Sequence, residues 1–196
     1  MKAYHYSSTL KEGDRLVPGY QKYMSLCEPF IQALEHSKDC FYGMLLNGKY
    51  MYAVMSRSGL REWSDYAKWA TEAIFEYVRR NEYPQCISRL NCNYFCDDLS
   101  ECIKMYNDDW GEASAEEQES VHLFEIELSG SMEKRDISIF DAAYDAISND
   151  QDIEAALRYA AMYFSEECTD RSKLECLSTE EAIAGKDISY MLREQK

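Results

Sequence analysis

Three stretches of the chain have the hydrophobic spacing of amphipathic helices. Over residues 62–80, 139–147 and 153–164, apolar side chains recur at steps of three and four positions, with polar side chains between them. This spacing places the apolar side chains on one face of a helix, which then packs against the rest of the protein. A further helix is predicted within residues 20–36, where Pro29 suits the first turn of a segment that continues through Phe30 and Leu34.

Other stretches have the pattern of strands. Residues 121–128 alternate, with His122 and Phe124 on one face and Glu125 on the other. Further extended segments are predicted at residues 3–8, 87–95, 174–177 and 187–192. The apolar run 50–55 does not distinguish helix from strand, and Asp97 and Asp98 precede a short helix through Tyr106. Strands and helices mix without a strict βαβ alternation, which predicts an α+β fold.

The length and composition favour one domain with its own core. The chain has 196 residues, 46% of them hydrophobic and 13% aromatic, with only 8 Gly and 3 Pro. This composition excludes wholesale disorder and collagen-like repetition. We therefore expect a single domain over residues 1–196.

The net charge narrows the range of partners. It is -15, and because nucleic-acid binding relies on Lys and Arg that neutralise phosphates, we expect no non-specific binding to DNA or RNA. The acidity is regional, since residues 97–133 carry 12 acidic residues and one basic residue, whereas residues 1–96 carry 10 acidic and 12 basic residues. Residues 107–120 are interpreted as a solvated acidic loop or insertion, or a frayed helix end. The N-terminal half can still face an anion.

The sequence contains no pattern typical of a metal site or of a membrane span. The 8 cysteines form no Cys-x-x-Cys pair, and the 3 histidines form no His-x-His or His-x-x-x-His pair, so we expect no metal site and disfavour a metal-dependent hydrolase. No stretch approaches the roughly 20 apolar residues of a membrane span, and polar Ser7, Ser8 and Thr9 follow the first residues in place of a signal-peptide run. We therefore expect a cytoplasmic protein that does not bind membranes and keeps its cysteines reduced.

Short motifs in a particular order resemble the ADP-ribosyltransferase superfamily. The order begins with His5-Tyr6-Ser7 in the opening strand, continues through a helix and an extended Ser88-Arg89 segment, and ends with Glu175-Cys176-Leu177. The similarity is closest to the diphtheria-toxin-like branch and to uncharacterised bacterial relatives with the pattern Glu-x-x-Arg, Pro, Ser-Arg, which is matched at Glu76, Arg79, Pro84, Ser88 and Arg89. The resemblance implies a split, strongly bent, mainly antiparallel sheet with flanking helices that clamps NAD.

The resemblance implies that Glu175 and His5 are the catalytic residues. Glu175 would accept a hydrogen bond from the nicotinamide-side ribose and stabilise the oxocarbenium-like centre as the glycosidic bond breaks. His5 would hold a hydroxyl of the adenosine-side ribose, because an imidazole offers one donor and one acceptor.

Other residues would bind the remaining parts of NAD. The backbone at Tyr6 and Ser7 would bind the nicotinamide amide. Tyr94, with Tyr52 as the second choice, would stack on the nicotinamide ring, and the Arg89 guanidinium would pair with the pyrophosphate.

Ordinary structural roles compete with each of these assignments. His5 would then be a half-buried strand histidine, and Tyr94 a core residue. Arg89 and Glu76 would form a structural ion pair. Glu175 would be one of several solvated glutamates, and His122 a hydrogen-bonded core histidine, unless it lines the cleft.

The motifs also differ from those of arginine-modifying relatives. Lys173 stands two residues before Glu175, where those enzymes carry Glu or Gln, and Ser88-Arg89-Leu90 lacks the second serine of their Ser-x-Ser strand. We predict an NAD-dependent ADP-ribosyltransferase of the kind found in toxins and defence effectors, with an unidentified macromolecular acceptor. The alternative is a non-catalytic interaction module on the same scaffold, whose acidic surface binds a basic partner.

Overall fold

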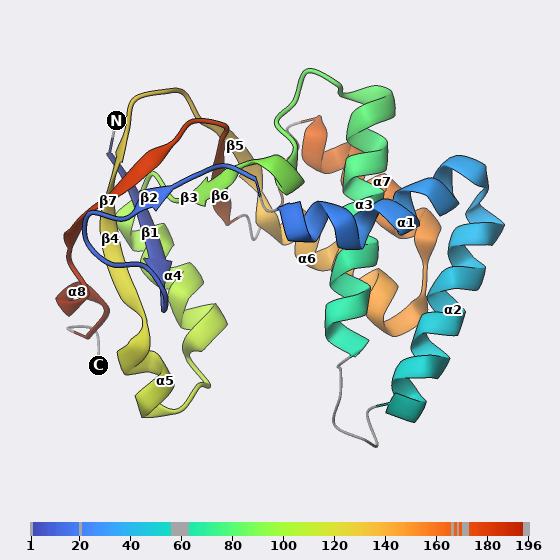
Figure 1. Ribbon diagram of the computed structural model, residues 1–196, viewed down its shortest axis with the longest axis horizontal. Coiled ribbons are helices and arrows are strands. Elements are labelled where there is room, and N and C mark those ends of the chain that lie inside the picture. Colours follow the sequence, from blue (N-terminus) through green and yellow to red (C-terminus); the bar gives the residue numbers. More distant parts are fainter. Residues whose placement is uncertain are drawn as a thin grey trace. The chain divides into compact units, whose positions relative to one another are not determined.

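The computed structural model describes residues 2–19, 21–55, 63–165, 167, 169 and 173–193. Strands and helices mix along the chain, which confirms the predicted α+β class (Figure 1). The helices are α1 (Gln21–His36), α2 (Lys38–Met55), α3 (Trp63–Glu82), the short 3-10 helix η2 (Arg89–Asn91), α4 (Leu99–Trp110), α5 (Ala115–Ser120), α6 (Ile137–Asp145), the π-helical turn η3 (Ala146–Asp150), α7 (Ile153–Phe164) and α8 (Tyr190–Arg193). The strands are β1 (Lys2–Ser7), β2 (Arg15–Leu16), β3 (Asn93–Phe95), β4 (His122–Leu128), β5 (Glu133–Asp136), β6 (Leu174–Ser178) and β7 (Ala182–Asp187).

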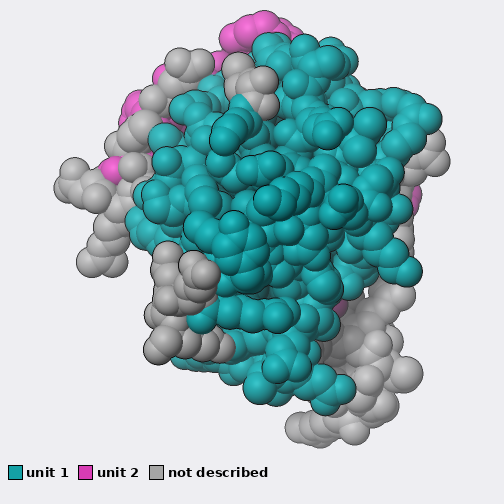
Figure 2. All heavy atoms as spheres, turned by 90° about the vertical axis from the view of Figure 1, so that its left-hand side faces the viewer, with its two compact units in different colours: residues 1–19, 92–135, 173–196 teal, residues 20–91, 136–172 magenta. Residues whose placement is uncertain are grey.

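The chain forms two compact units, each assembled from separated segments. Unit 1 comprises residues 1–19, 92–135 and 173–196, and unit 2 comprises residues 20–91 and 136–172. The strands lie with α4, α5 and α8 in unit 1, and the remaining helices form unit 2. In the view of Figure 2, the segments of unit 1 form one continuous surface. The sequence did not predict this division.

Two sheets form the framework of unit 1. The strand order is β1-β4-β7-β2 in the four-stranded sheet and β3-β6-β5 in the three-stranded sheet. A single bridge links β1 to the end of β3, where Tyr4 and Cys96 exchange backbone hydrogen bonds of 2.7 and 2.9 Å. Side chains also connect the two sheets, since the Asn93 amide donates to the Leu16 carbonyl of β2 at 3.2 Å and His5 Nδ1 lies 2.9 Å from the Tyr94 carbonyl oxygen.

The two faces of β1 pack against different cores. One face, which we call the Phe124 face, contributes Ala3 to a core with Phe95 and Phe124. The opposite face contributes Tyr4 to a core with α4 and α8 side chains such as Ile103 and Leu192. Burying a large apolar side chain contributes roughly 1.5–3 kcal/mol, so these two cores hold β1 between them.

Helix α3 is the centre of unit 2. The predicted helical spacing is confirmed, but residues 70–76 are buried on every side and not along one stripe only. Helices α1, α6 and α7 pack around α3, and the Phe75 ring contacts Phe140 and Tyr163 at centroid distances of 5.0 and 5.2 Å. This complete burial encloses Glu72 and Glu76, whose carboxylates need partners inside the protein.

Two local predictions are wrong, and the structure assigns one segment that the sequence left undecided. Helix α1 begins at Gln21, so Pro29 lies inside it, because packing of the buried side chains Cys27, Phe30 and Ile31 outweighs the lost backbone bond. The predicted strand 187–192 is instead the end of β7 followed by α8. The apolar run 50–55 belongs to α2, although the side chain of Tyr52 lies outside the described residues.

Two further segments differ from the expected extended chain or loop. Residues 87–95 contain a 3-10 turn before the short strand β3. Residues 107–120 are mostly helical, since they form the last turn of α4 and the whole of α5, which begins with a capping box between Ser114 and Glu117. They are solvated, as predicted, because no residue of α5 is buried. Among the helices that the structure describes, none combines the length and apolar character of a membrane span.

Candidate active site

His5 lies in β1 with one ring nitrogen bound inside unit 1. Its Nδ1 atom is 2.9 Å from the carbonyl oxygen of Tyr94. Because a carbonyl only accepts hydrogen bonds, Nδ1 donates, and Nε2 of the neutral ring keeps its lone pair as an acceptor. Burial lowers the pKa of His5, although the bond to Tyr94 opposes this shift. The ring is therefore neutral near pH 7, and Nε2 is able to accept a hydrogen bond from a ligand hydroxyl.

The backbone amide and carbonyl of Tyr6 point away from β4. Successive residues of a strand direct these groups to opposite sides, so Tyr6 directs them to the same side as Tyr4, toward β3. Tyr4 uses them in the bridge to Cys96, but Tyr6 forms no such pair with Tyr94, whose carbonyl accepts from His5. The separation of the two sheets thus begins at Tyr6.

Contacts of Leu123 confirm this direction from the opposite strand. Leu123 lies across from Tyr6 in the pairing of β1 with β4. Its amide donates to Ser189 Oγ at 3.0 Å and its carbonyl accepts from the Ile188 amide at 2.8 Å, so neither group bonds Tyr6. Within the part of the chain that the structure describes, the Tyr6 backbone therefore offers one donor and one acceptor side by side.

Ser7 does not share this property. Its Oγ accepts from the amides of Thr9 and Leu10 at 3.2 and 3.4 Å, so it holds the turn that follows β1. Its backbone groups point toward β4, opposite His122. Of the two residues predicted to bind an amide through their backbone, Tyr6 alone has the required orientation.

Glu175 and Tyr94 lie on the same face of the three-stranded sheet. Tyr94 pairs with Leu177, and Glu175 is two residues earlier in β6, so the two side chains are diagonal neighbours roughly 7–8 Å apart. Glu175 is 2% exposed, which excludes the alternative of a solvated glutamate. Together with the bond between His5 and Tyr94, this register brings three predicted site residues onto neighbouring strands of unit 1.

Helix α4 contributes charged contacts around these strands. The Tyr6 hydroxyl donates to Asp109 Oδ2 at 2.6 Å, and burial together with this bond raises the pKa of Tyr6. Asp108, the preceding residue, pairs with Lys173 just before β6. The sequence predicts that these aspartates lie in an acidic loop. It does not predict their partners, because Tyr6 and Asp109 are 103 positions apart in the chain.

Arg89 belongs to unit 2 and forms a buried ion pair there. Its Nε and Nη2 atoms donate to Glu72 at 3.1 and 3.2 Å, and Nη1 donates to the Tyr163 hydroxyl at 2.9 Å. The guanidinium also lies over the Phe140 ring, 4.2 Å from its centroid. The structural alternative is therefore favoured over a pyrophosphate ligand, with Glu72 in place of Glu76 as the partner.

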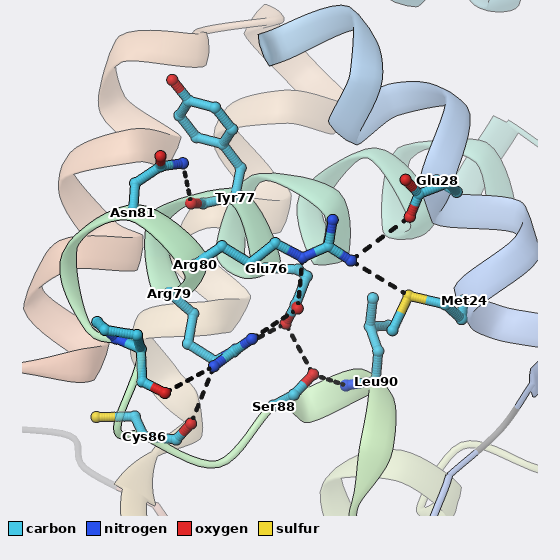
Figure 3. A network of polar contacts seen from close by, with 11 residues as sticks. Met24, Glu28, Glu76, Tyr77, Arg79, Arg80, Asn81, Cys86, Ser88 and Leu90 are labelled. Carbon is cyan, nitrogen blue, oxygen red and sulfur yellow. Dashed lines mark hydrogen bonds and ion pairs between the residues drawn. The ribbon is translucent and has the colours of Figure 1, made fainter.

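The motif residues Glu76, Arg79 and Ser88 also form a structural network, shown in Figure 3. Arg79 donates to both carboxylate oxygens of Glu76 at 2.9 Å, and Ser88 Oγ donates at 2.7 Å. Arg80 adds a bond of 2.9 Å. Burial opposes ionisation, but these donors hold the pKa of Glu76 below its usual value. Arg79 also donates to the carbonyls of Pro84 and Cys86, which fastens the loop after α3 to the helix.

Several acidic side chains of residues 107–120 bind partners within unit 1. Asp108 pairs with Lys173, Asp109 accepts from Tyr6, and Glu117 caps α5 by accepting from Ser114. Three of the acidic side chains on which the interaction-module alternative depends therefore serve the fold of unit 1.

A second polar cluster consists of His122, Asp187 and Ser189. The sequence does not predict it, because His122 is far from the other two residues along the chain. His122 Nδ1 is 2.8 Å from Asp187 Oδ2, and Ser189 donates to the other carboxylate oxygen. The His122 side chain is 42% exposed, so it is not the core histidine that the apolar face of its strand predicted. Its position at the end of β4 was the only available signal.

The described cysteines carry free thiols. They are Cys27, Cys40, Cys86, Cys92, Cys96, Cys102 and Cys176, and Cys168 lies outside the described residues. Burial raises the pKa of Cys176 to about 12, as expected for a small apolar core residue. Within the described ranges, no group of three or more His, Cys, Asp or Glu side chains is placed to hold a metal ion.

A family model described as "Protein of unknown function (DUF2441)" matches residues 21–188. This range covers most of the chain. The chain belongs to this family. The range matched by the DUF2441 model includes Tyr94, His122 and Glu175, whereas β1 with His5 and Tyr6 precedes it. No curated protein matches the chain.

Proposed function

We propose that this DUF2441 protein is an NAD-dependent ADP-ribosyltransferase whose site lies in unit 1, where the two sheets separate. The observation that carries the proposal is the Tyr6 backbone, which offers a donor and an acceptor beside the neutral ring of His5. The isolated backbone bridge between Tyr4 and Cys96 supports the split sheet that the resemblance to ADP-ribosyltransferases implies.

The nicotinamide carboxamide has the complementary groups. Its carbonyl accepts from the Tyr6 amide, and its NH₂ group donates to the Tyr6 carbonyl, which gives two-point recognition without a charged residue. The neighbouring Tyr94 supplies an aromatic ring for stacking on nicotinamide. The Nε2 atom of His5 accepts a hydrogen bond from a ribose hydroxyl.

Glu175 supplies the negative charge that the reaction needs. As the bond between the ribose C1 atom and the nicotinamide nitrogen breaks, its electron pair moves to the nitrogen and positive charge develops on the ribose. A carboxylate buried beside this centre stabilises a charge that exists mainly in the transition state. Arg89 has no part in this proposal, because Glu72 and Tyr163 occupy its guanidinium.

The partner and location follow from the same chemistry. The ADP-ribose acceptor is a macromolecule of unidentified type, and arginine is disfavoured because Lys173 stands where the arginine-modifying motif carries Glu or Gln. We place the protein in the cytoplasm, where the free thiols of unit 1 and unit 2 remain reduced.

Release of nicotinamide from NAD tests the proposal. Wild type, Glu175→Gln, His5→Ala and the control Glu119→Gln, which changes an exposed glutamate of α5, are compared at equal folded concentration. We expect Glu175→Gln and His5→Ala to lower the rate by at least about 100-fold, and the control to match wild type. Absence of nicotinamide release by wild type, or full activity of both variants, would refute the assignment.

A further inference from the structure

The cluster of His122, Asp187 and Ser189 has the geometry of an oriented base. Asp187 Oδ2 accepts from His122 Nδ1 at 2.8 Å, while Oδ1 accepts from the Ser189 amide at 2.8 Å and from its hydroxyl. Partial burial opposes ionisation, but these bonds hold the pKa of Asp187 below its usual value. An ionised carboxylate on Nδ1 fixes the hydrogen there and leaves the lone pair on Nε2.

The cluster is not a Ser-His-Asp nucleophile triad. In such a triad the serine contacts the ring nitrogen opposite the carboxylate. Here Ser189 Oγ lies 3.4 Å from Nδ1, the same atom that bonds Asp187, and it also accepts from the Leu123 amide. Ser189 is 7% exposed and serves to hold the carboxylate. Within the described residues, Nε2 of His122 has no partner, and the side chain is 42% exposed.

The register of β1 and β4 places His122 next to the candidate site. His5 pairs with Phe124, and Ser7 pairs with His122, so both histidines lie on the Phe124 face. As diagonal neighbours on an antiparallel pair they are roughly 7–8 Å apart. The His122 ring also stacks on Phe124, with a centroid distance of 6.1 Å, which limits its rotation.

We infer that His122 is the general base that activates the acceptor, and that the acceptor group is a hydroxyl; this inference rests on the proposed ADP-ribosyltransferase function. Nε2 takes the hydroxyl proton as the oxygen forms a bond to the ribose C1 atom. The bond from C1 to the nicotinamide nitrogen breaks, its electron pair stays on nitrogen, and neutral nicotinamide leaves. Asp187 stabilises the resulting imidazolium, which later releases its proton to water.

The chemistry of the acceptor follows from the need for a base. A hydroxyl is a weak nucleophile until its proton is removed, whereas a carboxylate needs no deprotonation. The imidazole of His122 suits this task, because it lies at an exposed strand end where a macromolecular hydroxyl can reach it. Hydroxyl-bearing side chains and ribose hydroxyls share this chemistry.

The test uses NAD with methanol as the acceptor probe, and measures nicotinamide and methyl-ADP-ribose. We expect His122→Asn, whose amide still donates to Asp187, to lower methyl-ADP-ribose formation about 100-fold without changing NAD affinity. Asp187→Asn is a second variant and loses less activity. The exposed His36→Asn is the matched control and behaves as wild type.

The pH dependence and chemical rescue separate a base from a structural role. The groups facing His122 that change charge are Asp187 and, through a 3.4 Å bond from the Asp187 amide, Glu12. We expect the wild-type rate to fall toward acidic pH, because protonation of Nε2 removes the lone pair that a general base needs. This limb disappears in His122→Ala, and added imidazole restores part of its rate.

Each outcome decides one proposal. Wild type that releases no nicotinamide overturns the proposed function, and this inference with it. Wild-type activity that Glu175→Gln abolishes, while His122→Asn keeps the wild-type rate and pH profile, overturns this inference alone.

Discussion

Buried polar groups in unit 2 bind one another, whereas several polar groups in unit 1 keep unused hydrogen-bonding capacity. Glu72 and Arg89 bind each other, and Glu76 accepts from two arginines and Ser88. In unit 1, by contrast, the ring of His5 and the backbone of Tyr6 are each oriented by internal bonds yet retain an acceptor or a donor among the described residues. Satisfied networks stabilise a fold, and oriented groups with remaining capacity are suited to binding a ligand.

The motifs that resemble ADP-ribosyltransferases are divided between the two units. The Glu-x-x-Arg, Pro, Ser-Arg pattern is explained by the need to neutralise Glu76 and to fasten the loop after α3. The His5-Tyr6 and Glu175 elements lie instead in unit 1, on strands β1 and β6. Four predictions follow for the contrast between the units, each on a different group.

The largest effect is expected for Arg89→Ala in unit 2. The substitution leaves the Glu72 carboxylate buried without its cation, so we expect the free energy of unfolding to fall by about 3–5 kcal/mol, measured by urea denaturation. The double variant Glu72→Leu with Arg89→Met removes both charges and should recover much of this loss. A change below about 1 kcal/mol in Arg89→Ala would contradict the structural role of the pair.

Ser88→Ala should have a smaller effect in the same unit. It removes one hydrogen bond to the buried Glu76 carboxylate, and we expect a loss of about 2 kcal/mol in the free energy of unfolding. Ser165→Ala, which changes an exposed hydroxyl at the end of α7, is the control. Equal stability of the two variants would show that Ser88 does not support the network.

His5 should make the stability of unit 1 depend on pH. Burial lowers its pKa in the folded chain below the value of 6.5 expected after unfolding. The contribution of His5 to stability is therefore complete above pH 6.5 and is lost as the pH falls from 6.5 toward the folded pKa. We expect a slope of up to about 1.4 kcal/mol per pH unit, measured by denaturation between pH 7 and pH 5.

The variant His5→Asn checks the origin of this slope. Its amide still donates to the Tyr94 carbonyl but does not titrate, so the slope should disappear. His36→Asn, which changes an exposed histidine, should keep the wild-type slope. A slope unchanged by His5→Asn would assign the titration to another group.

Tyr6→Phe should have the smallest effect and distinguishes side chain from backbone. The hydroxyl bond to Asp109 is lost, so we expect a decrease of about 1 kcal/mol in the free energy of unfolding. Because the proposed amide recognition uses the backbone, the rate of nicotinamide release should stay within about threefold of wild type. A loss of more than about tenfold would mean that the hydroxyl takes part in the reaction.

Periodic segments were predictable from the sequence, and long-range partners were not. The strand at 121–128 and the helices at 62–80 and 153–164 follow from spacing alone, because each buries one continuous face. The sequence predicts Pro29 in the first turn of a helix, whereas α1 begins at Gln21. A proline inside a helix is tolerated only when packing compensates for the lost hydrogen bond, and the sequence alone does not show this packing. The fold class survived these local errors because it depends on the mixture of elements.

The candidate site was predictable only where the resemblance named residues. His5, Tyr94 and Glu175 lie on neighbouring strands, and nothing in the local sequence distinguished Arg89 as a partner of Glu72. The contact between His122 and Asp187 spans 65 positions, and no spacing rule links residues so far apart. Which charged side chains pair depends on which of them are buried next to each other in the folded chain, and residue spacing does not give this information.

One comparison tests the central claim that unit 1 carries the chemistry and unit 2 supports the fold. Nicotinamide release from NAD and urea unfolding are measured for Glu175→Gln and Arg89→Met in parallel. We predict that Glu175→Gln loses at least about 100-fold in rate at equal or nearly equal stability, and that Arg89→Met loses stability while its folded fraction keeps the wild-type rate. Wild-type turnover in Glu175→Gln, or lost turnover in folded Arg89→Met, would contradict the account.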